Sequence, residues 1–205
     1  MTKVRFMLTR RTMLLLGAAS IVTLAAGPHA WAQDGDATTF VVRLGDALTK
    51  VVNGSGSYED KKQRLAPLVE SAVDVDGIAR FALGRFWRNA SPQQQQEYTR
   101  LFRAVLMNNV FSRIGELQGV TFAPTQTTRS EEGTAVGTVI SRPNQQPSNV
   151  QWIVSSVGGQ PKIVDVKAEG TSLRLTQRND YAAYLTRNGS NVDALIGAMR
   201  QQVSG

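Results

Sequence analysis

Any catalysis by this chain would have to use Asp, Glu, Lys, Tyr or Ser side chains, because its 205 residues include no cysteine and one histidine, His29. Asp74 and Asp76 lie two residues apart and could act together as a general acid and a general base. Asp165 stands inside the apolar run KIVDVKAEG, where a buried carboxylate would need a cationic partner.

Each of these carboxylates also has a structural interpretation, which we favour over catalysis. Asp74 or Asp76 can cap a short helix that begins near residue 77. Glu131 and Glu132 are predicted to lie at a solvated hairpin tip. Asp165 can pair with one of the arginines that recur on the short helix, which are Arg80, Arg85 and Arg88.

Residues 1–32 have the pattern of a secretory signal peptide. Residues 1–12 contain basic and no acidic side chains, and residues 13–26 form an apolar run shorter than the ~20 residues that span a bilayer. Ala30 and Ala32 supply the small residues of a signal-peptidase site, so we expect cleavage between Ala32 and Gln33. Residues 9–14 (TRRTML) partly match a twin-arginine signal, and both export routes stay open.

Removal of residues 1–32 changes the composition that bears on function. Four of the 23 Lys and Arg residues leave with the signal, so residues 33–205 carry 19 basic and 16 acidic side chains and a net charge of +3. This small net charge gives no strong indication of nucleic-acid binding. His29 leaves as well, which excludes histidine zinc sites, Ser-His-Asp triads and Cys-His dyads in the mature protein.

The mature chain is expected to form one domain with helices, then a curved antiparallel sheet, then helices, which is an α+β fold. Apolar residues at helical spacing predict helices over 37–53, 58–73, 77–87, 92–117, 176–188 and 191–203. The helix after Ser91 begins with a capping box and is the longest, at about 26 residues or ~39 Å. Runs rich in Val, Ile and Thr predict four strands over 120–128, 133–142, 149–158 and 162–169.

The apolar residues of these elements permit either a filled hydrophobic core or a cavity for an apolar ligand. The strand over 133–142 alternates larger residues with Ala135, Gly137 and Ser141. Small residues opposite a long helix leave room for a ligand, and we expect Val136 to face that space. On this prediction Val136→Trp reduces ligand binding with little loss of stability, whereas the same change in a packed core would cause strain.

Three segments of the mature chain resemble the MlaC family, also called the toluene-tolerance family. They are residues 83–92 (LGRFWRNASP) with the Gln-rich helix start that follows, residues 164–166 (VDV) with 169–173 (EGTSL), and residues 191–196 (NVDALI). Each motif is weak alone, but the three occur in order and at matching spacing over nearly the whole mature chain.

The resemblance implies an NTF2-like α+β fold, with a curved antiparallel sheet of about four strands packed against N-terminal helices, a long helix and C-terminal helices around an apolar cavity. It implies a periplasmic phospholipid carrier that maintains outer-membrane lipid asymmetry. Its expected partners are an outer-membrane Mla lipoprotein complex and an inner-membrane ABC transporter with an MCE-domain subunit. The phospholipid is cargo; no cofactor, metal, nucleic acid or catalytic residue is expected, and the carrier is expected to be a monomer.

On the same resemblance, we expect apolar residues of the long helix, the sheet and the C-terminal helices to line the cavity. Two alternatives stay open: a hopanoid-associated carrier of the same family, and an NTF2-like envelope enzyme with Asp165 as its carboxylate base. The predicted lipid-binding residues are Phe86, Phe102, Leu106, Val110, Ile114, Val136, Trp152, Val154, Leu173, Tyr184 and Leu185.

We expect the protein isolated from its native envelope to begin at Gln33, because signal peptidase cuts after an Ala-x-Ala sequence. N-terminal sequencing or intact-mass measurement checks this. A native protein that retains residues 1–32 would contradict the export prediction.

Overall fold

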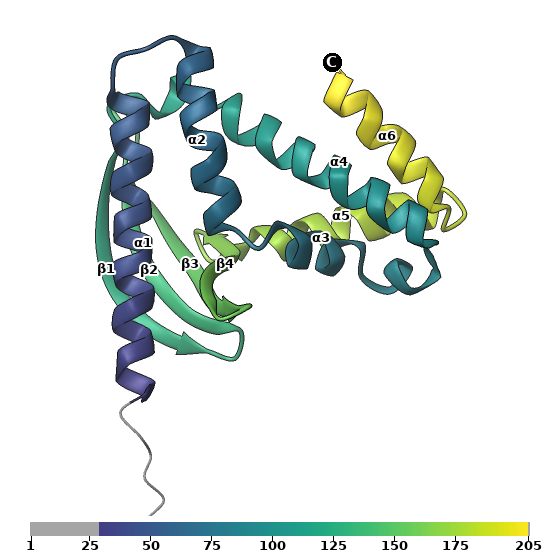
Figure 1. Ribbon diagram of the computed structural model, residues 1–205, viewed down its shortest axis with the longest axis horizontal. Coiled ribbons are helices and arrows are strands. Elements are labelled where there is room, and N and C mark those ends of the chain that lie inside the picture. The colour runs from purple at the N-terminus through teal and green to yellow at the C-terminus, as the bar shows by residue number, and fades with distance from the viewer. Residues whose placement is uncertain (1–28, 205) are drawn as a thin grey trace, which may run out of the picture.

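Helices precede and follow a single antiparallel sheet in the computed structural model, which describes residues 29–204 (Figure 1). The predicted α+β class is therefore confirmed, and residues 1–28 of the predicted signal lie outside the described range. The helices are α1 (His29–Asn53), α2 (Tyr58–Ala72), α3 (Val75–Leu83), α4 (Pro92–Phe111), α5 (Leu173–Arg187) and α6 (Val192–Ser204), with short 3₁₀ helices at Gly84–Asn89 and Gly115–Leu117. None of the helices in this range is long and apolar enough to cross a membrane.

The helix α4 begins at the predicted residue and ends earlier than predicted. Ser91 Oγ accepts a hydrogen bond from the Gln94 backbone N–H at 3.2 Å, and Gln94 Oε1 accepts one from the Ser91 N–H at 2.9 Å. The helix stops at Phe111, after which the Ser112 hydroxyl donates back to the Asn109 carbonyl at 3.1 Å. Serine and glycine favour such turns over helix, so the predicted helix over 92–117 is a 20-residue helix, a turn and a 3₁₀ helix.

The helix α3 is capped as predicted and is shorter than the predicted helix over 77–87. The Asp74 carboxylate accepts a hydrogen bond from the Gly77 N–H at 3.1 Å, which confirms the capping role of Asp74. Gly84 has φ of +58°, in the left-handed region that glycine adopts most readily, and the α-helix ends there.

The sheet has the order β1-β2-β3-β4-β5 and is antiparallel throughout, with one short strand more than predicted. Its strands are β1 (Thr121–Ser130), β2 (Gly133–Ser141), β3 (Ser148–Val157), β4 (Gln160–Ala168) and β5 (Thr171–Ser172). A bulge in β1 between Pro124 and Thr127 lies opposite Gly137. A Cβ at Gly137 would be 2.5 Å from Thr125 Oγ1, so β1 fills the space that the sequence assigned to a ligand.

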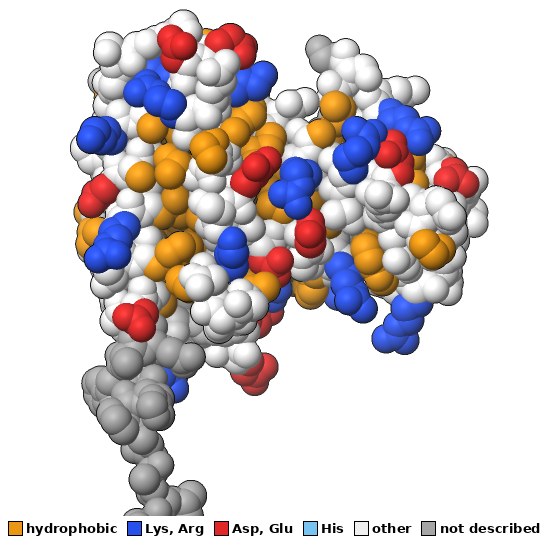
Figure 2. All heavy atoms as spheres, viewed as in Figure 1, with side chains coloured by type: hydrophobic (Ala, Val, Ile, Leu, Met, Phe, Trp, Pro, Cys, Tyr) orange, Lys and Arg blue, Asp and Glu red, His pale blue; other side chains and the backbone are white. Residues whose placement is uncertain are grey.

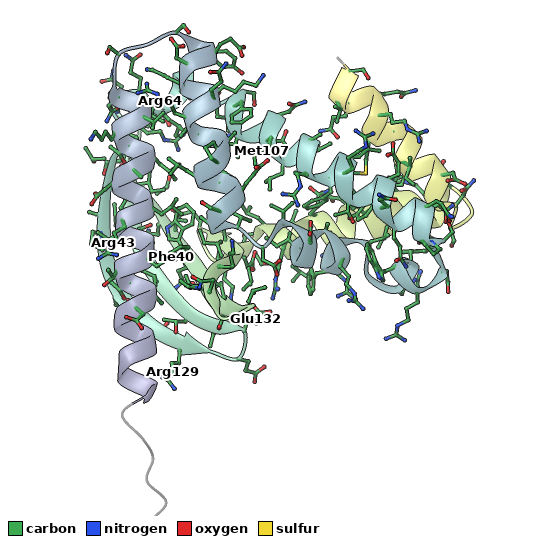
Figure 3. The ribbon with its side chains drawn as sticks, viewed as in Figure 1. Phe40, Arg43, Arg64, Met107, Arg129 and Glu132 are labelled. Atoms are coloured by element: carbon green, nitrogen blue, oxygen red, sulfur yellow. The ribbon has the colours of Figure 1, made fainter. Side chains whose placement is uncertain are left out.

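The elements form two groups in space (Figure 1), and buried residues make a separate core in each. In one, α1 lies along the sheet, where Ala37 and Val41 pack on Val136 and Val154. In the other, α3, α4, α5 and α6 enclose a core of their own that contains Tyr98. A third cluster joins α2 to the C-terminal end of α4, where Met107 projects toward α2 (Figure 3).

Asp165 lies at the junction of the two groups. A second bulge, in the pairing of β3 with β4, places its side chain on the opposite face of the sheet from that of Ile163. In the pairing of β3 with β4, Val154 lies opposite Ile163 and Ile153 lies opposite Asp165. Cross-strand partners share a face and adjacent residues do not, so Asp165 and Ile163 are on opposite faces although they are two residues apart. The Asp165 carboxylate accepts hydrogen bonds from Ser172 Oγ at 2.6 Å and from the Val166 N–H at 2.8 Å.

Arg174 is the cationic partner of Asp165, and the predicted partners on α3 and the following 3₁₀ helix are wrong. Its Nε is 3.7 Å from Asp165 Oδ2, and its guanidinium also pairs with Glu132 and lies 4.4 Å from the Phe81 ring centre. Arg80 and Arg85 instead lie over aromatic rings of their own segment. Glu131 and Glu132 lie at the predicted exposed hairpin tip between β1 and β2, where Figure 3 labels Glu132. Glu132 has a further role, since it accepts a hydrogen bond from Arg174 of α5.

We expect Asp165→Ala to lower the free energy of unfolding by about 3–5 kcal/mol, because it leaves Arg174 partly buried and removes the acceptor of several donors. The matched control is Asp76→Ala, which breaks an exposed 2.8 Å pair with Arg103 and should cost about 1 kcal/mol or less. Urea unfolding of both variants measures the difference. Equal losses would show that the buried pair is not the stronger constraint.

Candidate functional site

An apolar cavity of about 230 Å³ lies between α1 and the sheet. One wall comes from α1, the other from β1, β2 and β3, and the segment that follows α4 closes one end. The lining contains no charged side chain, so the cavity can accept hydrocarbon but cannot hold an ion. The lining residues are Val41, Leu44, Gly45, Leu48, Thr49, Val52, Leu117, Val120, Phe122, Ile140 and Trp152.

The polar atoms next to this lining have partners outside the cavity. Trp152 Nε1 donates to Thr138 Oγ1 at 2.9 Å, and the Thr138 hydroxyl donates to the Val150 carbonyl at 3.1 Å. The Thr49 hydroxyl donates to the Gly45 carbonyl of its own helix at 2.7 Å. The indole of Trp152 therefore presents its hydrocarbon surface to the cavity without an unpaired N–H group.

Two residues of α1 determine how the helix meets the sheet at the cavity. A Cβ at Gly45 would be 2.7 Å from the Phe122 ring, so glycine allows the close approach of α1 to β1 at this point. Asn53, at the end of α1, accepts a hydrogen bond from the Gly119 N–H at 2.7 Å and donates to the Val120 carbonyl at 3.1 Å. These bonds hold the segment that closes the cavity against the C-terminal end of α1.

A more open groove of about 530 Å³ lies on the other side of α1, between α1, α2 and the start of β4. Its apolar wall comes from Phe40, Leu44, Ala47, Leu68 and Ala72, and Figure 2 shows hydrophobic side chains gathered along the line between α1 and α2. Phe40 and Arg43 of this groove project from α1 in Figure 3. Leu44 lines both the groove and the cavity, so the two spaces adjoin at this residue.

The predicted lipid-binding residues are distributed over several clusters, and of them Trp152 lines the cavity. Val136 and Val154 belong to the packed contact between α1 and the sheet. Leu173 is exposed at the start of α5. Lipid contact by the residues outside the cavity stays a prediction; Phe86, Phe102, Leu106, Tyr184 and Leu185 lie in the core of α3–α6, and Val110 and Ile114 in the cluster with α2.

The cavity-lining residues that are not among the predicted lipid-binding residues lie mainly on α1. The stripe Val41, Leu44, Leu48 and Val52 has helical spacing, so a buried face of this helix could be recognised in the sequence. The stripe does not show which element covers it. The structure places α1 against the sheet and α4 against α2, α3 and α6, which is why the long helix does not line the cavity.

The titratable groups near the cavity and in the cores have structural roles. Both oxygens of Asp165 are occupied by Ser172, Arg174 and the backbone, which leaves no free position for a general base. Burial raises the pKa of Tyr181 to about 12 and the pKa of Tyr98 further, so both phenols stay neutral near neutral pH. The Tyr98 hydroxyl donates to the Ala79 carbonyl at 2.9 Å. The described residues contain no group of three or more His, Cys, Asp or Glu that could hold a metal ion.

Comparison with known proteins identifies the family of this chain. A model of the MlaC protein family matches residues 43–201. The chain belongs to the MlaC family. It is 26% identical over 201 residues to the toluene tolerance protein ttg2D of Pseudomonas putida, which covers 96% of this chain and 91% of the relative.

A solved structure shares the MlaC-type fold of this chain. It is a phospholipid-binding protein from Ralstonia solanacearum in complex with a phospholipid, with 20% sequence identity and a TM-score of 0.72. The similarity covers 82% of this chain and 97% of that protein. The resemblance in the sequence is thereby confirmed at the level of the family and of the fold.

In this MlaC-family protein, we expect Ile140→Trp to enter the cavity and Val136→Trp to overpack a filled site. Both residues belong to β2 and lie four positions apart, so their side chains share a face. Val136 has no exposed surface and packs on Val41 and Val154, so its replacement should cost about 1–3 kcal/mol of stability. This placement reverses the sequence expectation of a stable Val136→Trp variant.

The Ile140→Trp variant should lose less than about 1 kcal/mol of stability, because the indole has free volume to enter. It should also take up less labelled phospholipid. Urea unfolding of the delipidated variants and a lipid-uptake assay measure the two effects. A larger loss of stability at Ile140 than at Val136 would overturn the assignment of the cavity.

Proposed function

We propose that this protein is a periplasmic phospholipid carrier without enzymatic activity. The observation that carries the proposal is the apolar cavity between α1 and the sheet in a chain of the MlaC family. The solved relative from Ralstonia solanacearum, with the same fold, binds a phospholipid. An acyl chain can enter such a cavity because each Å² of apolar surface removed from water contributes ~25 cal/mol.

The cavity volume limits how much of a lipid can enter while α1 stays in place. About 230 Å³ is less than the ~300–1,000 Å³ of pockets that bury drug-sized ligands, and a phospholipid is larger than such ligands. Loading a whole phospholipid therefore requires more space than the cavity of this structure offers, and we infer that it comes from a widening of the gap between α1 and the sheet. Ala37, Val41, Val136 and Val154 make this contact apolar, so acyl chains can replace the contacts that α1 loses.

The proposed transport route is the one that the family resemblance implies. The carrier receives phospholipid from one envelope membrane and delivers it to the other, with an outer-membrane Mla lipoprotein complex and an inner-membrane ABC transporter as its partners. Acyl chains are buried in a bilayer as well as in the carrier. Net transfer therefore depends on these partners and not on the cavity alone.

We expect protein purified without detergent from its native envelope to carry phospholipid. Native mass spectrometry gives the mass and number of bound molecules, and organic extraction followed by lipid mass spectrometry identifies them. A bound hopanoid in place of phospholipid would assign the protein to the hopanoid-associated carriers of the same family. A lipid-free protein that takes up no labelled phospholipid from vesicles would overturn the proposed function.

A further inference from the structure

Four arginines gather on the surface where α3, the 3₁₀ helix that follows it and α5 meet. We call this group the arginine patch, and its members are Arg80, Arg85, Arg88 and Arg178. A Cβ at Gly84 would be 3.2 Å from Arg178 Nε, so the guanidinium of α5 lies against the residue directly before Arg85. The Arg80 guanidinium of α3 lies 5.7 Å from the ring centre of Trp87, the residue directly before Arg88. Figure 2 shows basic side chains that protrude at the lower edge of this part of the molecule.

The charge of the arginine patch is not neutralised within the described part of the chain. Over residues 29–204, no carboxylate forms an ion pair with any of its four members. The acidic residues at the start of α3 have other partners, since Asp74 caps the helix and Asp76 pairs with Arg103 at 2.8 Å. Asp180 of α5 lies two positions after Arg178, and side chains two apart on a helix do not face each other. The patch therefore leaves positive charge available to a partner outside the chain.

Aromatic rings hold guanidinium groups of the patch in place without removing their charge. The Arg85 guanidinium lies 4.9 Å from the ring centre of Phe86, and the Arg178 guanidinium lies 4.9 Å from the ring centre of Phe81. A ring face attracts a cation but supplies no opposite net charge. A guanidinium held in this way can still donate paired hydrogen bonds to phosphate oxygens. Because the rings already restrict the side chains, such binding loses less conformational entropy.

Exposed leucines border the arginine patch at the start of α5. Leu173 is 52% exposed and Leu175 is 48% exposed. Leu175 lies three positions before Arg178, so the two side chains are neighbours on the surface of α5. Cationic side chains beside exposed apolar ones suit a lipid surface, since cations attract anionic head groups and apolar side chains enter the acyl boundary. A purely acidic surface would match the arginines but would leave the leucines in contact with water.

We infer that the arginine patch and the two leucines dock this protein on a bilayer surface that contains anionic phospholipid. This inference rests on the proposed function and adds the surface by which the carrier meets a membrane that supplies or accepts its cargo. Phosphate oxygens of the head groups accept hydrogen bonds from the guanidinium groups, and the leucines contact the outer part of the acyl region. Exposed charges are screened by salt, so the docking weakens as the salt concentration rises.

The test measures binding of the delipidated protein to sedimented vesicles. One set of vesicles contains phosphatidylcholine alone, and the other contains phosphatidylcholine and phosphatidylglycerol in equal amounts. Wild-type protein should bind the second set more tightly and should lose this preference at high salt. A variant with both Arg85→Gln and Arg88→Gln should bind the second set about twenty- to thirtyfold more weakly, because each arginine near an anionic bilayer strengthens binding about fivefold. Both residues are exposed, and uptake of labelled phospholipid from neutral detergent shows that the variant is folded.

The matched control carries both Lys50→Gln and Arg113→Gln, which remove the same charge from exposed positions. Lys50 is in the last turn of α1 and Arg113 follows α4, whose 20 residues span about 30 Å from the 3₁₀ helix end to this one. This distance is about three Debye lengths at ordinary salt, so the control should bind both sets of vesicles like the wild type. A variant with Leu173→Gln and Leu175→Gln keeps the charge and should bind the phosphatidylglycerol vesicles severalfold more weakly.

Three outcomes would overturn the inference while leaving the carrier function intact. They are equal binding of the wild type to both sets of vesicles, equal losses in the arginine variant and its control, and unchanged binding of the leucine variant. Binding to immobilised polyglutamate that depends on Arg85 and Arg88, in a protein that does not bind the phosphatidylglycerol vesicles, would also overturn it and would assign the patch to an acidic protein. Wild-type protein that takes up no phospholipid from detergent would instead overturn the proposed function itself.

Discussion

The buried contact between Asp165 and Arg174 is the constraint on which the arrangement of this protein depends. Asp165 belongs to the sheet and Arg174 to the first turn of α5, and Arg174 also contacts Glu132 of the β1–β2 turn and Phe81 of α3. A carboxylate that is 1% exposed is stable only with such partners. The bulge in β4 directs the Asp165 carboxylate toward α5, so this charge does not lie on the face of the sheet that α1 covers.

The opposite face of the sheet is held by a different kind of interaction. There, α1 packs through small and branched apolar side chains, and its C-terminal end is tied by Asn53 to the segment after α4. Apolar contacts are non-directional, so hydrocarbon from another molecule can take their place. The protein thus combines a junction made by a directional ion pair with a wall held by non-directional apolar contacts.

Much of the local structure follows from short-range chemistry that can be read in the sequence. The capping box at Ser91, the cap at Asp74 and the alternation of strands and turns after residue 119 predicted the observed elements. The motifs at residues 83–92, 164–173 and 191–196 predicted the MlaC family, which the family comparison confirmed. Two predicted helices were too long at their C-terminal ends, because the apolar stripe continues beyond the residue at which the helix ends. Glycine follows the end of α3 at Gly84, and serine follows the end of α4 at Phe111.

The sequence by itself determined the elements, the α+β class, the family and the absence of cysteine chemistry, because these depend on residue type and near neighbours. Only the tertiary structure decided that α1 rather than α4 forms the wall of the cavity, and that Gly137 accommodates the β1 bulge. It also decided that Asp165 pairs with Arg174. An apolar stripe or a buried charge shows that a partner is required but does not identify it, since the choice depends on bulges and packing between segments distant in the chain.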